Sequence, residues 1–88
     1  MNNRDTAPEQ SESPAFHSEV DARGQRCPMP LLMAKRGLNA LETGQILSVL
    51  STDSASRGDF STFARQSGHE LLLDEEAGGE YRFLLRKR

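Results

Sequence analysis

The Cys-Pro-Met-Pro segment at residues 27–30 separates two hydrophobic periodicities, and it constrains the fold more than any other feature. Before it, Val20 and Ala22 alternate with charged residues, which is typical of a short strand. After it, apolar residues recur at helical spacing, namely at Leu31, Ala34, Leu38 and Leu41. Proline is tolerated in the first turn of a helix, because its missing N–H would have no intrahelical partner there. We therefore predict a strand-to-helix turn with Pro28 at N1, Pro30 at N3, and Cys27 at the N-cap or beside it.

Two glycines give further information on the predicted first helix, one on its end and one on its packing. Gly44 follows the last apolar position and predicts the end of the helix. Gly37 lies inside the helix, where glycine costs about 1 kcal/mol relative to alanine. Its presence there predicts that the helix packs closely against a neighbouring element.

The remaining periodicities extend the pattern to β-α-β-α-β-β. Residues 45–52 are apolar and partly β-branched, as expected of a central strand. Residues 53–68 predict a second helix with Asp53 as N-cap, Gly68 as C-cap, and an apolar face formed by Phe60, Phe63 and Ala64. Residues 69–76 and 81–88 predict a hairpin around Ala-Gly-Gly-Glu, with Tyr81, Phe83 and Leu85 on one face. Each amphipathic helix needs one partner layer, so we predict an α/β two-layer sandwich in which a mixed four-stranded sheet carries two helices on one face.

The length of the chain and its polar beginning set the domain organisation. Its 88 residues are enough for one small domain. The first 17 residues have little to bury and cannot offset the entropy of ordering. We predict a disordered N-terminal tail over residues 1–17 and a folded domain over residues 18–88.

Composition argues against several classes of protein. The net charge of −2 includes no basic excess, so we expect no direct binding of nucleic acid. A single cysteine cannot form an internal disulfide, which favours a reducing cytoplasm. No segment has the length and apolarity of a signal peptide or a membrane span, so no membrane association is expected. Cys27, His17 and His69 have no recognisable ligand spacing, so we expect no metal site.

Cys27 stands where a thiol can become reactive. The positive end of the helix dipole would lie beside its sulfur, with Arg26 adjacent and Arg23 close by, and these charges favour the thiolate. The absence of a second cysteine excludes an internal dithiol cycle, and His69, the only candidate base in the domain, is more typical of the start of a strand. The remaining chemistry is that of a thiol that accepts a group from one protein and passes it to another.

The segment Asp-Ala-Arg-Gly-Gln-Arg-Cys-Pro-Met-Pro, followed later by Gly-His-Glu-Leu and the terminal Tyr-Arg-Phe-Leu-Leu-Arg-Lys-Arg, resembles the TusA/SirA-like family of small sulfur-carrier proteins. The resemblance covers residues 19–88. It implies the same sandwich fold and a transient covalent persulfide on Cys27, with no other cofactor. It also implies a cysteine desulfurase as donor and a sulfur-acceptor protein, in tRNA thiolation, molybdenum-cofactor assembly or another part of sulfur metabolism.

One segment departs from the family pattern. The family commonly has Asp-Pro-Ala at the start of the second helix, where this chain has Asp53, Ser54 and Ala55. If this loop selects partners, the pathway of the best-known family member does not carry over to this chain.

Two groups of residues around the thiol are candidates for function. Persulfide stabilisation or partner docking is expected of Arg26, Pro28, Met29, Pro30 and Leu31. Partner contacts are expected of Arg23, Lys35, Arg36 and Asp53. Leu32 and Met33 lie off the apolar stripe and suit either a docking patch or the edge of the core. We expect a monomer that forms transient complexes.

Three other functions stay open at this point. The chain could be a regulatory or interaction domain in which Cys27 only caps a helix. It could be a redox sensor in which peroxide converts Cys27 to a sulfenic acid. An RNA-binding module is suggested by the terminal Arg-Lys-Arg, but no aromatic stacking pattern accompanies it.

Overall fold

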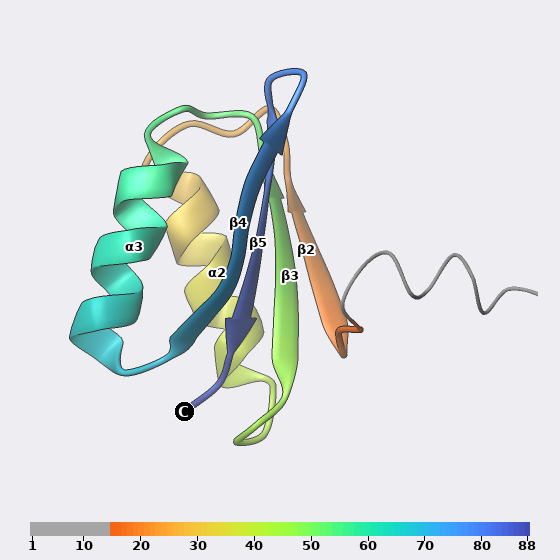
Figure 1. Cartoon of the computed structure of the whole chain (residues 1–88), viewed down its shortest axis with the longest axis vertical. Helices are drawn as coiled ribbons and strands as arrows, with labels where there is room; N and C mark the ends of the chain where they lie inside the picture. Colours follow the sequence, from red (N-terminus) through yellow and green to blue (C-terminus); the bar gives the residue numbers. More distant parts are fainter. Residues whose placement is uncertain (1–14) are drawn as a thin grey trace, which may run out of the picture.

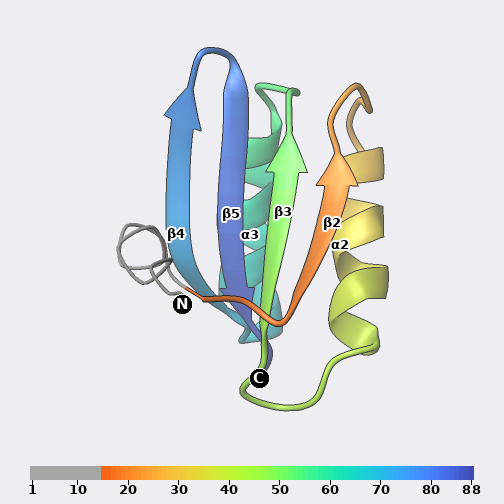
Figure 2. The ribbon, with the colours of Figure 1, turned by 90° about the vertical axis from the view of Figure 1, so that its right-hand side faces the viewer.

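Six elements follow one another in the predicted order in the computed structural model, which describes residues 15–88. They are β2 (Ser18–Ala22), α2 (Met29–Asn39), β3 (Ile46–Ser51), α3 (Ser56–Ser67), β4 (Glu70–Ala77) and β5 (Glu80–Arg86). The sheet has the strand order β2-β3-β5-β4; β2 and β3 are parallel, and the other two pairs are antiparallel. Both helices lie against one face of this sheet (Figures 1 and 2). The predicted mixed, four-stranded, two-layer sandwich is confirmed.

Ordered contacts begin slightly before the predicted domain boundary. Most of the tail predicted over residues 1–17 lies outside the described residues. His17, however, donates its backbone N–H to the carbonyl of Ile46 (2.8 Å), and its Nδ1 accepts the Ile46 N–H (3.0 Å). These bonds attach the residue that precedes β2 to the start of β3.

The hydrophobic core lies between the sheet and the two helices. α2 packs mainly on β2 and β3, and α3 packs on β4 and β5. The buried core residues come from every layer: Ala34, Leu38, Leu47, Val49, Phe60, Phe83 and Leu85. Both predicted apolar helix faces point into this core, with Leu31, Leu41, Phe63 and Ala64 packed at its margin.

The helix boundaries differ from the prediction at three of their four ends, and α2 begins one residue late, at Met29. α2 ends at Asn39 rather than near Gly44, because Ala40 and Leu41 turn back with N–H bonds to Gly37 and Leu38 (3.3 and 3.0 Å). α3 begins at Ser56, although Asp53 accepts the Ala55 N–H and so caps the turn leading into it. Gly68 closes α3 in the left-handed conformation, as predicted. No helix within residues 15–88 has the length and apolarity needed to cross a membrane.

The predicted hairpin joins β4 to β5 through Gly78 and Gly79. Both glycines have positive φ angles, 61° and 83°, as a two-residue hairpin turn of this hand requires. Phe83 and Leu85 are buried in the core and Tyr81 packs against it, so the predicted common face of these three residues is confirmed. An irregularity between Leu71 and Leu73 shifts the register of β4.

Gly37 lies at a close approach between α2 and the sheet. A Cβ atom added there would stand 3.0 Å from Cγ2 of Val20 and 3.1 Å from both methyl carbons of Leu47. The predicted close packing is therefore confirmed.

This contact predicts opposite outcomes for two glycine substitutions. Gly37→Ala should lower the free energy of unfolding, since overpacking costs about 1–3 kcal/mol and offsets a helix-propensity gain of about 1 kcal/mol. Gly58→Ala in α3 is the matched control, because nothing lies within 4 Å of the added Cβ. It should stabilise the fold by about 0.5–1 kcal/mol. Urea unfolding measures both changes, and equal stabilisation by the two substitutions would contradict the close approach.

Candidate functional site

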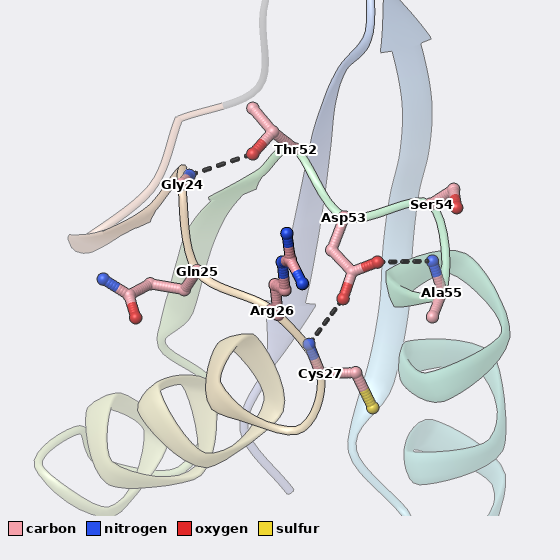
Figure 3. A pocket seen from close by; sticks show the side chains of 8 residues that line it. All are labelled: Gly24, Gln25, Arg26, Cys27, Thr52, Asp53, Ser54 and Ala55. Carbon is pink, nitrogen blue, oxygen red and sulfur yellow. Dashed lines mark hydrogen bonds between the residues drawn. The ribbon is translucent and has the colours of Figure 1, made fainter.

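Two loops that are distant in sequence meet at one edge of the sheet. β2 and β3 are parallel neighbours, so the loops that follow their carboxyl ends emerge side by side. Residues 24–27 of the first loop and 52–55 of the second line an open pocket (Figure 3). The pocket contains Cys27 and Asp53, two of the residues singled out in the sequence.

The two loops are joined by hydrogen bonds from main chain to side chain. Gly24, which turns the first loop with a φ of 82°, donates its N–H to Oγ1 of Thr52 (2.9 Å). The N–H of Cys27 donates to one carboxylate oxygen of Asp53, and the N–H of Ala55 donates to the other (3.1 Å; Figure 3). Asp53 thus holds the main chain of Cys27 and the entry to α3 at the same time.

The environment of Asp53 favours its ionised form. Its bonds from the amides of Ala55 and Cys27, together with the charge of Arg26, lower the pKa of its carboxyl group. Below this loop, the buried hydroxyl groups of Ser51 and Ser56 lie 2.7 Å apart, and the Asp53 N–H donates to Ser51 (3.1 Å). The main chain of Asp53, whose carboxylate holds Cys27, is therefore hydrogen-bonded to a buried side chain.

Cys27 precedes α2 and does not cap it. Pro28 is the N-cap residue and Pro30 is at N2, so the predicted positions move by one residue. The amide of Met29 donates to the carbonyl of Arg26 (2.8 Å), and no side chain caps the helix. The Cys27–Pro28 peptide bond is cis. The exposed sulfur of Cys27 faces α3, the neighbouring helix.

The predicted low thiol pKa is wrong. Sγ of Cys27 donates a hydrogen bond to Oδ2 of Asp59, on the first turn of α3, at 3.2 Å. This bond raises the pKa of the Cys27 thiol above its ordinary value; loss of hydration and the negative charges of Asp59 and Asp53 act in the same direction. In the structure the neutral thiol, not the thiolate, is the favoured form.

The four basic residues that we expect to act near the thiol lie in different surroundings. Arg23 pairs with Asp21 (2.8 Å) and Glu80 (3.6 Å), and its hydrogen bond lowers the pKa of Asp21 to about 2. Lys35 places its ammonium 5.6 Å from the ring centroid of Phe63. Among the four predicted basic residues, Arg26 lines the pocket, whereas Arg36 is exposed on α2.

The apolar residues beside Cys27 divide into two groups. Met29 and Leu32 are 38% and 43% exposed, large values for such side chains. Pro30 is buried, and Leu31 packs against the core. The exposed pair on the first turn of α2, Met29 and Leu32, therefore remains as a candidate docking patch.

Asp59 and Thr52 are the site residues that sequence reasoning missed. Neither belongs to the Cys-Pro-Met-Pro segment, and Asp59 is 32 positions from Cys27. The available signal was topological, since a β-α-β unit with parallel strands brings both strand-to-helix loops to one edge. Once the loop that contains Cys27 is taken as the site, this topology predicts that residues 52–59 lie beside it.

Comparison with known proteins gives a consistent assignment. The family model described as Sulfurtransferase TusA matches residues 18–87. A protein of Allochromatium vinosum named Sulfur carrier protein TusA is 49% identical over 72 residues, covering 82% of this chain and 95% of its own. A putative sulfur carrier protein of Neisseria meningitidis is 39% identical over 69 residues, covering 78% of this chain and 93% of its own.

A solved structure agrees with these sequence matches. The SirA-like protein from Desulfitobacterium hafniense superimposes with a TM-score of 0.70 at 30% identity, covering 80% of this chain and 96% of that one. The family match extends over the whole sandwich and includes both loops of the pocket. The chain belongs to the TusA sulfurtransferase family of sulfur carriers.

Proposed function

We propose that this protein carries sulfur as a persulfide on Cys27, receiving it from a cysteine desulfurase or a similar persulfide donor and passing it to an acceptor protein. Family membership supports the existence of a donor and an acceptor. The exposed position of the chain's single thiol in the pocket is the observation that carries the proposal. The pathway served, whether tRNA thiolation, molybdenum-cofactor assembly or another branch of sulfur metabolism, depends on which acceptor docks.

The proposed transfer requires only exchange between sulfur atoms. In loading, the Cys27 thiolate attacks the outer sulfur of the donor persulfide. A new S–S bond forms at Cys27, the donor's own S–S bond breaks, and the donor sulfur leaves with the electron pair as a thiolate. In delivery, an acceptor thiolate attacks the outer sulfur, and Cys27 leaves as a thiolate that takes up a proton. Atoms and electrons balance without an oxidant, so the protein acts as a co-substrate that shuttles between partners.

The geometry suits repeated exchange of sulfur with partner proteins. The sulfur is exposed, while the main chain beneath it is held by Asp53. A partner can therefore reach the sulfur without unfolding the loop. Met29 and Leu32 offer apolar surface on the turn that follows Cys27, where a transient complex can form.

The alternatives are less well supported by the same observations. Capping of α2 by Cys27 is contradicted, because Pro28 is the N-cap and no side chain caps the helix. A redox sensor needs neither a sulfur donor nor a sulfur acceptor, whereas membership of a family of sulfur carriers implies both.

Intact-protein mass after incubation with a cysteine desulfurase and cysteine tests the proposal. The expected result is a gain of one sulfur atom per chain, reversed by a thiol reductant. An absence of gain with several desulfurases and with a small-molecule persulfide would contradict the carrier function. The interaction-domain and sensor functions would then take precedence.

A further inference from the structure

Asp59 is positioned by a helix and not by a mobile loop. Its N–H donates to the carbonyl of Ala55 (3.1 Å), which places it in the first regular turn of α3. Its carboxylate is only partly exposed and reaches across to the sulfur of Cys27, which α2 and its preceding loop present. The helix N-terminus favours a negative charge at this position.

We propose that Asp59 is a positioning residue that distinguishes the empty carrier from the loaded one, holding the Cys27 thiol in its protonated form until a partner docks and disfavouring retention of the transferred sulfur. This role rests on the proposed function, because it concerns the two states that a sulfur carrier alternates between. Asp59 acts through Cys27 and forms no bond to the transferred sulfur.

The two states make different demands on the same carboxylate. In the empty state Sγ bears a hydrogen, which it donates to Oδ2 of Asp59. In the loaded state Sγ is bonded to Cβ and to the outer sulfur, so it has no hydrogen to donate and this bond is lost. The outer sulfur of a persulfide ionises more readily than a thiol, and its negative charge would lie close to the Asp59 carboxylate. Lost hydrogen bonding and like-charge repulsion both favour release of the sulfur.

The other charged groups near the sulfur do not cancel this effect. Asp53, in the loop after β3, adds a second negative charge and raises the thiol pKa further. Arg26, in the cysteine's own loop, acts on Asp53 and lowers its pKa. Arg57, on the same turn of α3 as Asp59, is paired with Asp74 of β4 (2.9 Å). Of the charged groups near the sulfur, the one that is hydrogen-bonded to it is therefore acidic.

A raised pKa also slows the reaction of the empty thiol with unintended targets. The thiolate fraction falls tenfold for each unit by which the pKa rises, whereas the nucleophilicity of the thiolate gains only about threefold. The net reactivity at neutral pH therefore falls. A carrier with this arrangement is protected between encounters with its partners.

The first test uses the sulfur-free protein and needs no donor. The rate of alkylation of Cys27 by iodoacetamide is measured from pH 6 to pH 10 in the wild type, in Asp59→Asn and in Glu42→Gln. The control Glu42→Gln removes the same charge from an exposed residue in the loop between α2 and β3, at the opposite end of the sheet from the sulfur. Asp59→Asn should move the alkylation midpoint to lower pH and raise the rate at pH 7 several-fold, while Glu42→Gln follows the wild type. An unchanged or slower profile for Asp59→Asn would overturn the proposal.

The second test compares how the two states are populated. Wild-type and variant proteins are equilibrated with glutathione persulfide and glutathione, and the loaded fraction is read from intact mass. Asp59→Asn should retain sulfur several-fold more at equilibrium. Reduced retention would overturn the role assigned to Asp59 and would instead indicate that the carboxylate assists loading. If none of the proteins loads sulfur although the alkylation midpoint shifts in Asp59→Asn, the carrier function is contradicted. The proposed effect of Asp59 on sulfur release is then overturned, and Asp59 only suppresses the reactivity of the thiol.

Discussion

Replacing Cys27 with serine is expected to abolish sulfur acceptance completely. Cys27 is the only sulfhydryl in the chain, so no other side chain can form the persulfide. A serine hydroxyl can still donate to Asp59, and the side chain at this position is exposed, so the fold should be retained. Intact mass after incubation with a desulfurase and cysteine should show no added sulfur, and the urea unfolding midpoint should match that of the wild type.

The same variant separates the proposed function from its alternatives. An interaction domain would bind its partners equally well with serine at position 27, and its activity in cells would not change. A redox sensor would lose its peroxide response but would not have accepted sulfur in the first place. Sulfur that still accumulates on Cys27→Ser would reflect binding outside a cysteine and would contradict the assignment of the carrier site to Cys27.

Replacing Phe60 with alanine is expected to cause a large loss of stability. Phe60 is fully buried, and its ring stacks on Phe83 with a centroid separation of 4.5 Å. Deleting a buried phenylalanine side chain costs about 3–5 kcal/mol, and a domain of this size has a free energy of unfolding of roughly 4–10 kcal/mol. Thermal unfolding followed by circular dichroism should therefore show a large fall in Tm, with part of the protein unfolded near 37 °C.

Phe63→Ala is the matched control for this effect. Phe63 lies one turn further along α3 but only at the margin of the core, where it is partly buried. Its removal should cost distinctly less than that of Phe60. An equal cost for the two substitutions would contradict the placement of the Phe60–Phe83 stack at the centre of the core.

The fold was predictable because its hydrophobic periods are local. Val20 and Ala22 alternate, Ala34 and Leu38 recur at helical spacing, and the Gly-Gly turn marks the hairpin, so each element is specified by its own residues. The end of α2 was not predictable in this way. Leu41 reaches the core from a turn rather than from a fourth helical repeat, and this arrangement depends on how the chain returns to β3.

The site was only partly predictable, because its chemistry depends on contacts between distant residues. The exposure of Cys27 and its place before a helix followed from the two prolines. The direction of its pKa shift did not, since the residues adjacent in sequence, Arg23 and Arg26, suggested a positive environment. In the fold Arg23 is paired elsewhere, and Asp59 approaches from α3. The charged residues adjacent to Cys27 in the sequence therefore did not predict the charged groups that surround its sulfur in the fold.

The direction in which the chain runs through the sheet has a practical consequence for handling the protein. The carboxyl end runs beside the loop after α2, where Gly44 donates to the carbonyl of Lys87 and Lys87 donates to the carbonyl of Gln45. This edge of the sheet is opposite to the loops that contain Cys27 and Asp53 (Figure 1). A linker attached after Arg88 would therefore leave from the far side of the domain. The protein can be anchored to a bead or a sensor chip through this end with its sulfur facing the solution, which makes the lifetimes of its complexes directly measurable.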